Sequence, residues 1–294
     1  MALSIFTSGA AMSSTNALNK SNSILSTAME RLGTGKRINS AADDAAGLQI
    51  ATRLQGQVNG MGVAQRNVAD ATAMLQTAEG AFDEVTNILY RMKDLSTQAA
   101  NDTNGKNERT AIKAELTELT SELGNIMANT KYAGEVLFGD GTATALTGGK
   151  LGGAMNFQIG ADSAEKLTLN LNVGSTTLSA TVGSLKGFDL DIASGTAATD
   201  LGKINTLMTG LQTALDNVSG VRSALGANIN RLGHTSANLA NMKDNTTLAL
   251  GNIRDADFAT EATSMTRNQM LAQTSMSMLK QANSMSGMVM SLLG

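Results

Sequence analysis

Hydrophobic side chains recur every seven residues over two long parts of the chain. Within 61–99, one row starts at Met61 and a second starts three positions later at Ala64, and a comparable row starts at Ile204. Interleaved seven-residue rows are typical of the seam of a coiled coil. We therefore predict two long helices that pack antiparallel along a seam of Met61, Val68, Leu75, Phe82 and Leu89 with Leu211, Val218, Leu225 and Leu232.

Acidic residues mark where these helices are expected to begin. A carboxylate at a helix start accepts hydrogen bonds from the first free amides and favours the positive end of the helix dipole. The chain has no Pro, which permits long uninterrupted helices. The predicted caps are Asp43 and Asp44 before the first long helix, Asp200 before the second, and Asp255 and Asp257 before a last helix starting near Phe258.

Between the long helices the pattern changes twice. "TNGKNE" interrupts the heptads, and apolar residues from Ile112 to Ile126 then predict a shorter helix, which the turn-like stretch "KYAGEVLFGDG" follows. From 139 to 199 the chain is rich in Gly, Thr, Ser and Leu, and "NFQIG" and "KLTLNLNV" alternate apolar and polar residues as strands do. We expect a small β-rich insert with Leu167, Leu169, Leu171 and Val173 on one face.

Both ends of the chain carry apolar stripes at helical spacing. The closing segment 276–294 has Met or Leu at almost every helical turn and one charge, Lys280. Short isolated helices are marginal in water, so we expect this segment to be disordered in a free molecule and helical when buried against other copies. The expected contact residues are Leu18, Leu25, Leu32, Phe258, Met265, Met276, Leu279, Val289 and Leu292.

The layout is nearly palindromic: terminal helix, long helix, insert, long helix, terminal helix. The predicted fold is mainly α, a long antiparallel α-helical coiled-coil hairpin or bundle with discontinuous N- and C-terminal helices and a small β-rich outer insert. The expected parts are 1–42 (N-terminal helix and spoke), 43–138 (first half of a helical rod), 139–199 (insert), 200–254 (second half of the rod) and 255–294 (C-terminal helix).

Composition narrows the class of function. A net charge of -3 gives no basic field for nucleic acid or an anionic membrane. No stretch reaches the ~18–20 apolar residues of a membrane span, and the N-terminus has no secretory signal pattern. Without Cys there is no disulfide and no thiolate metal site. These features alone would predict a cytosolic protein.

Little in the sequence favours catalysis. His234 is the only histidine, and one histidine does not make a zinc site without other strong ligands. "GTGKR" at 33–37 lacks the spacing of a phosphate-binding loop. The pair Asp43–Asp44 is better explained by helix capping than by acid–base work. We therefore expect no enzyme, and no catalytic, metal or cofactor site.

"RLGTGKRINSAADDAAGLQIATRL" (31–54) and "NIRDADFATEATSMTRNQML" (252–271) resemble bacterial flagellin. The resemblance extends through "RNVADATAMLQTAEGAFDEVTNIL" and "MLKQANSMSGMVMSLL" and covers about 1–140 and 200–294, in the family's order. It implies a secreted, extracellular structural subunit that self-assembles into the flagellar filament for motility. The terminal helices would form the filament core, and the insert would face outward.

The resemblance also implies partners. These are other copies of the chain, the flagellar type III apparatus that exports it unfolded, a chaperone on its C-terminal region, and the filament cap and hook-junction proteins. The family's segment for the animal Toll-like receptor would include Arg91, Leu95 and Glu115. Tyr90 stands where strongly recognised members have glutamine. The alternative is that Arg91 and Glu115 are ordinary surface charges.

Two other classes share part of the pattern. A hook–filament junction protein has similar terminal helices but is less similar around "RDADFATE". A cytosolic signalling coiled coil of the chemoreceptor type would need neither the strand-rich insert nor paired terminal stripes.

Overall fold

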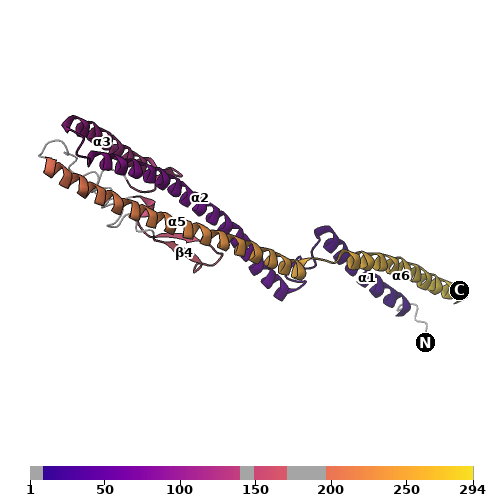
Figure 1. Cartoon of the computed structure of the whole chain (residues 1–294). Helices are drawn as coiled ribbons and strands as arrows, with labels where there is room; N and C mark the ends of the chain where they lie inside the picture. Colours follow the sequence, from indigo (N-terminus) through magenta and orange to yellow (C-terminus); the bar gives the residue numbers. More distant parts are fainter. Residues whose placement is uncertain (1–8, 140–148, 171–196, 294) are drawn as a thin grey trace. The chain divides into compact units, whose positions relative to one another are not determined.

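The computed structural model describes residues 9–139, 149–170 and 197–293 of the chain, and most of these residues are helical (Figure 1). This confirms the mainly α fold that the heptads predict. In the described ranges the helices are α1 (Gly9–Thr34), α2 (Ala45–Ala99), α3 (Lys106–Asn129), α5 (Ala197–Arg254) and α6 (Phe258–Leu293). The remaining elements are strands β1 (Lys131–Tyr132), β2 (Glu135–Val136), β3 (Met155–Gln158) and β4 (Lys166–Leu169), and the 3-10 turn η1 (Lys150–Gly152).

The chain forms two compact units. The terminal unit comprises Met1–Val58 and Asp244–Gly294, and the central unit comprises Asn59–Lys243. The terminal unit is therefore built from both ends of the sequence, while the central unit is one continuous stretch.

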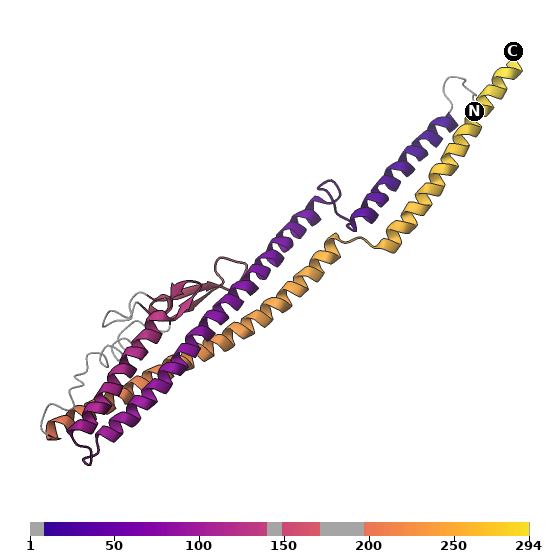
Figure 2. The same cartoon turned by 90° about the horizontal axis from the view of Figure 1, so that it is seen from above.

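In the central unit, α2 and α5 run antiparallel side by side (Figures 1 and 2). Lys93 on α2 donates a hydrogen bond to Gln212 on α5, and Glu79, earlier on α2, pairs with Arg222, later on α5. The heptad residues fill the space between the helices. Every side chain named above for the seam is at most 4% exposed: Met61, Val68, Leu75, Phe82, Leu89, Leu211, Val218, Leu225 and Leu232.

Helix α3 runs back along α2 and completes this core. The guanidinium of Arg91 on α2 lies 2.6 Å from the carboxylate of Glu115 on α3. The buried face of α3 includes Ile112, Leu116 and Leu123 from the predicted row. The shorter helix expected after "TNGKNE" is thus confirmed.

A tight hairpin follows α3, where the sequence predicts a turn. Strands β1 and β2 pair antiparallel, with Ala133 (φ 51°) and Gly134 (φ 86°) between them. Positive φ at both central residues defines the type I′ turn that fits the twist of a hairpin. Just beyond it, the ring of Phe138 packs edge-on against Phe82 of α2, with centroids 4.8 Å apart.

The predicted strands in "NFQIG" and "KLTLNLNV" are also confirmed. β3 and β4 pair antiparallel with Phe157 opposite Leu167. Along β4 the side chains alternate: Leu167 and Leu169 are buried, whereas Lys166 and Thr168 are exposed. Leu171 and Val173, expected on the same face, lie outside the described residues.

This hairpin packs on α2 within the central unit. Asn67 of α2 donates a hydrogen bond to the carbonyl of Gln158 (3.2 Å). A side chain at Gly60 would bring its Cβ within 2.8 Å of the Cβ of Ala161, so the loop after β3 lies against the bare backbone of α2. The described part of the insert therefore packs directly on α2 and contributes to the core of the central unit.

The helix starts differ from the predicted caps in one residue of each acidic pair. Asp44 accepts a hydrogen bond from the Gly47 amide and caps α2, whereas Asp43 accepts from the amides of Asn39 and Ser40 in the preceding connector. The Ser40 amide, followed by that of Asn39, lowers the pKa of Asp43 below its usual value. The prediction that Asp43 caps the helix was wrong, because the connector folds back onto its carboxylate.

The other predicted caps divide in the same way. Asp257 caps α6, while the backbone of Asp255 forms a β-bridge with Lys36. Asp200 was wrongly predicted as the cap of α5, since this helix begins at Ala197 and Asp200 lies within its first turn. Alanines at 197 and 198 favour helix strongly enough to extend it past the acidic residue.

Candidate assembly surface

In the terminal unit, α1 and α6 pack antiparallel along their length (Figure 1). The residues buried at the contact are small or polar: Ser21 and Ala28 on α1, and Asn268 and Ala272 on α6. Larger side chains are only half-buried along its edges, namely Leu18, Leu25, Leu32, Met265 and Leu279. Small residues let two helices approach closely, but they bury little apolar surface.

The segment after α1 and the segment before α6 are hydrogen-bonded to each other, and this joins the two helices at one end. α1 ends at Thr34, and Gly35 takes a left-handed conformation (φ 69°) that redirects the chain. The Arg37 amide then donates to the Arg254 carbonyl (2.7 Å), and the Ala256 amide donates to the Gly35 carbonyl (3.0 Å). The stretch "GTGKR" is thus a helix end followed by a short antiparallel ladder, which sets where α6 begins relative to α1.

An ion pair between side chains joins α1 and α6 at this same end. Arg31 of α1 lies 3.0 Å from Glu261 of α6, with side-chain exposures of 29% and 14%. Glu261 belongs to the first turn of α6, where a negative charge also suits the helix dipole. Backbone ladder and ion pair together fix the register of α1 against α6.

A large apolar surface of the terminal unit is left uncovered. Soluble monomers rarely expose many large apolar side chains together, and such surfaces mark sites of association. These side chains are between 40% and 68% exposed: Met12, Ile24, Met29, Ile50, Leu248, Phe258, Met270, Leu271, Met276, Met278, Met285 and Met288.

The residues predicted to contact other copies fall into three groups. Leu18, Leu25, Leu32, Met265 and Leu279 line the edges of the α1–α6 contact, while Phe258 and Met276 are exposed. The side chains of Val289 and Leu292 lie outside the described residues. The exposed Leu271, Met278 and Met285 were not among the predicted residues, because α6 is apolar on more than one face and a single stripe of helical spacing covers only one face.

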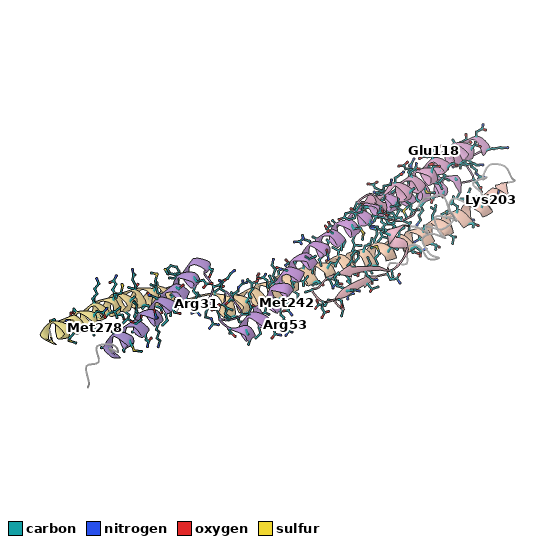
Figure 3. The ribbon with its side chains drawn as sticks, turned by 180° about the vertical axis from the view of Figure 1, so that it is seen from behind. Arg31, Arg53, Glu118, Lys203, Met242 and Met278 are labelled. Atoms are coloured by element: carbon teal, nitrogen blue, oxygen red, sulfur yellow. The ribbon has the colours of Figure 1, made fainter. Side chains whose placement is uncertain are left out.

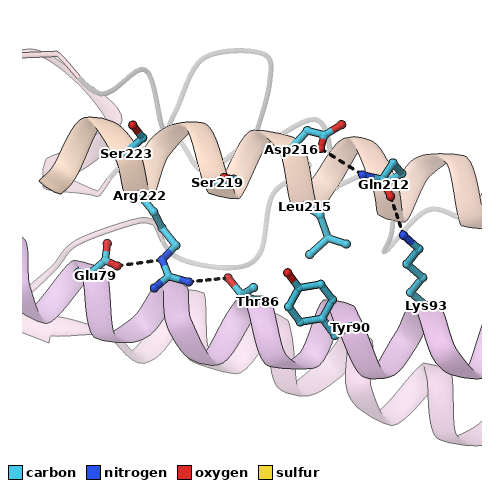
Figure 4. Close-up of a pocket in the computed structure, with 10 residues that line it drawn as sticks. All are labelled: Glu79, Thr86, Tyr90, Lys93, Gln212, Leu215, Asp216, Ser219, Arg222 and Ser223. Atoms are coloured by element: carbon cyan, nitrogen blue, oxygen red, sulfur yellow. Dashed lines mark hydrogen bonds and ion pairs between the residues drawn. The ribbon is translucent and has the colours of Figure 1, made fainter. Parts of the chain in front are cut away.

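The central unit has a polar groove of about 540 Å³ between α2 and α5 (Figure 4). Arg222 reaches from α5 to Glu79 (2.8 Å) and Asp83 (3.0 Å) on α2, and the hydrogen bond to Glu79 raises the pKa of Arg222. Farther along, Lys93 of α2 donates to Gln212 of α5 (2.6 Å). The groove thus contains contacts that bind the two helices to each other.

The residues named for an innate-immune receptor do not share one environment. Arg91 and Glu115 form an exposed ion pair with side-chain exposures of 56% and 44%. Leu95 is 2% exposed and belongs to the core of the central unit. Of these three residues, only Arg91 and Glu115 therefore expose their side chains on the surface of the central unit.

Other kinds of site find little support in the described part of the chain. His234 is exposed on α5, and no group of three or more His, Asp or Glu side chains among the described residues could hold a metal ion. None of the helices that the structure describes has a stretch long and apolar enough to cross a membrane.

Known proteins similar to this chain point to one family. A family model for the bacterial flagellin N-terminal helical region matches residues 5–144, and one for the C-terminal helical region matches 208–293. Polar flagellin B/D of Vibrio parahaemolyticus is 33% identical over the full length of both chains. A flagellin of Halalkalibacterium halodurans is 38% identical over 90% of each chain.

A solved structure shares the fold at greater distance. It is described as a flagellar hook-associated protein from Vibrio parahaemolyticus, and it is similar with a TM-score of 0.60 at 15% identity, covering 72% of this chain and 100% of that one. The matched family models at both ends and the full-length relatives carry the assignment: this chain belongs to the bacterial flagellin family.

Proposed function

We propose that the chain is a structural subunit of an extracellular flagellar filament, and that it polymerises by burying the exposed apolar faces of α1 and α6 against other copies. The observation that carries this proposal is the terminal unit itself. Its two helices meet through small residues and leave Phe258, Met276 and Met278 in solvent. A surface of this kind in a flagellin is what a subunit needs for self-association.

The free energy of association favours a polymer over a dimer of two subunits. A fully exposed side chain of this size contributes about 1.5–3 kcal/mol when it is buried, so these half-exposed side chains would each add about 1 kcal/mol. Association itself costs about 4–15 kcal/mol in lost freedom. A contact that covers a few of them is therefore weak, whereas several neighbours around one subunit bind it firmly. Contacts that do not close on themselves produce a helical filament.

Further partners are part of the same proposal. A subunit with this exposed apolar surface would associate too early unless another protein bound the surface, which supports a chaperone on the C-terminal region. It also supports export in an unfolded state through the flagellar type III apparatus. Filament cap and hook-junction proteins would meet the same terminal helices. Recognition by the animal Toll-like receptor would rest on Arg91 and Glu115, since Leu95 is buried.

The two other classes are not favoured. The likeness to a hook-associated protein is at 15% identity and concerns the fold alone. The relatives that align over the whole chain at 33% identity are flagellins, which argues against a hook–filament junction protein or a signalling coiled coil.

The test is removal of the closing segment 276–294. We expect the truncated chain to keep the thermal unfolding of its central unit but to add no mass to sheared filament seeds in sedimentation assays. A matched control lacks an equal number of residues within the insert, 175–193, and should still polymerise. Normal growth of the chain truncated at 276 would contradict the proposed assembly surface.

A second measurement follows the same segment in the intact chain. Amides of 276–294 should exchange with solvent rapidly in the free subunit and slowly in the filament. Slow exchange in both states would mean that the segment is ordinary intramolecular core.

A further inference from the structure

Among the described residues, most of the strongly exposed methionines lie in the terminal unit, and Met242 is the exception in the central unit. In the central unit, Met61, Met74, Met92 and Met127 are at most 5% exposed. In the terminal unit, several methionines of α1 and α6 are between 46% and 62% exposed (Met278 on α6 in Figure 3): Met12, Met29, Met270, Met276, Met278 and Met285.

Two of these methionines lie on one face of α6. Leu271, Met278 and Met285 are seven residues apart, which places them above one another on a helix. All three are about half exposed, so this row lies on a face that α1 does not cover. We call it the 271–285 row.

Methionine differs from leucine at such positions in one chemical respect. A hydroperoxide oxidises the thioether: a sulfur lone pair attacks the peroxide oxygen, the O–O bond breaks, an S–O bond forms and water leaves. Sulfur loses two electrons and the peroxide gains them. The sulfoxide is polar, and burying a polar group that has no hydrogen-bond partner opposes association. The chain contains no Cys and no Trp, so the main competitors for the oxidant are the other exposed methionines.

We propose that Met278 and Met285 form a peroxide-sensitive modification site, at which oxidation to the sulfoxide prevents a free subunit from joining the filament. The assembled filament protects the same side chains because neighbouring subunits cover the 271–285 row. This inference rests on the proposed assembly through α1 and α6. The central unit keeps its structure under the same treatment, since its core methionines are buried.

The experiment treats purified full-length subunits with hydrogen peroxide, removes the peroxide with catalase, and maps sulfoxides by peptide mass spectrometry. Treated subunits are then offered to sheared filament seeds. We expect sulfoxide at Met278 and Met285, none at Met61 or Met92, and a concentration needed for growth that is at least roughly tenfold higher, since tenfold corresponds to the burial of about one unpaired polar group. Intact filaments treated in the same way should keep both methionines reduced.

Matched variants locate the effect. Met278→Leu with Met285→Leu keeps the apolar surface, and peroxide should raise its concentration needed for growth less than that of the natural chain, although Met270 and Met276 still expose their thioethers. An equal rise in both chains would refute the assignment to these two positions. Met242→Leu removes a methionine of α5 that is 45% exposed in the central unit, and this control should remain sensitive. Met278→Gln with Met285→Gln mimics the polar product and should fail to grow without any oxidant. Methionine sulfoxide reductase should restore growth of the oxidised natural chain.

The outcomes separate this inference from the function on which it rests. Untreated subunits that do not grow on seeds would contradict the proposed assembly itself. If untreated subunits grow, and subunits with sulfoxide at both positions grow equally well, the modification site is refuted while the assembly surface stands. Oxidation of both methionines in intact filaments at the rate seen in free subunits would likewise refute the protection.

Discussion

At the scale of single residues, Asp257 shows how one carboxylate controls the start of α6. It accepts hydrogen bonds from the Thr260 hydroxyl (2.9 Å) and from the amides of Ala259 and Thr260. These bonds, that of the Thr260 hydroxyl first, lower the pKa of Asp257 below 3.8. A lowered pKa in the folded state means that the carboxylate stabilises the fold above pH 3.8 and that this contribution is lost as the pH falls through the folded pKa.

We therefore expect Asp257→Ala to lower the thermal midpoint of the terminal unit at neutral pH, and Asp257→Asn to lower it less, because Asn also caps helices. The difference between the natural chain and Asp257→Ala should shrink below pH 3.8. Circular dichroism melts across pH test this. Asp255→Ala is the control and should show neither effect. A difference that grows on acidification would contradict the capping role.

Arg222 and Arg91 both form ion pairs with carboxylates between helices, but the two ion pairs differ in burial. Arg222 of the groove donates to Glu79 Oε1 and pairs with Asp83, and the second carboxylate oxygen of Glu79, Oε2, is buried without a hydrogen-bond partner. Arg91 pairs with Glu115 in solvent. Arg222→Met should destabilise the central unit by about 1–2 kcal/mol, because it removes charged hydrogen bonds at a partly buried site. Arg91→Met should cost less than about 0.5 kcal/mol, as exposed pairs do. Urea denaturation measures both, and equal losses would refute the distinction.

At this scale the sequence indicates the type of residue but not its partner. The pairs Asp43–Asp44 and Asp255/Asp257 both predict caps, and one member of each pair does cap. Which member reaches the free amides depends on how the connector turns. The ladder between Gly35–Arg37 and Arg254–Ala256 decides that turn, and it joins residues more than two hundred positions apart.

At the scale of elements, heptad spacing predicts well because it reports the packing of one helix on another. The seam rows on α2 and α5 are buried almost without exception. The limits of the helices are predicted less well, as Ala197 at the start of α5 shows, since the propensity of a few residues outweighs a single cap. The faces of α6 could not be assigned from sequence, because apolar residues occur on more than one side of this helix and the proposed burying surface lies on other copies of the chain.

The β3–β4 hairpin provides an element-scale prediction. Leu167 and Leu169 are 1% and 3% exposed in the central unit. Leu167→Ala should destabilise this unit by about 2–5 kcal/mol, the range for a buried leucine that leaves a cavity. Lys166→Ala, on the exposed face of the same strand, should change the stability by less than about 0.5 kcal/mol. Denaturant unfolding of the whole chain tests the pair, and a neutral Leu167→Ala would mean that the hairpin does not contribute to the core.

At the scale of the whole molecule, assembly and stability should separate. Replacement of 140–196 by a short glycine linker removes η1, β3 and β4 and leaves the terminal unit unchanged. We expect filaments to form from this chain, because the proposed assembly surface lies on α1 and α6. Its central unit should unfold at lower denaturant concentration, because the linker no longer covers the apolar residues of α2. Loss of filament growth from a chain that is still folded would place an essential contact in the insert.

The terminal unit also sets an order of events. Arg31 and Glu261 are 230 residues apart in sequence, and α1 gains its partner helix only when that distance is closed. Closing so long a loop is entropically unfavourable until folding of the central unit shortens it. A chain that is cut or stalled before α6 leaves α1 unpaired and its register undefined. If subunits assemble through α1 and α6 as proposed, a chain must include both ends before it presents the assembly surface, and incomplete chains would not join the filament.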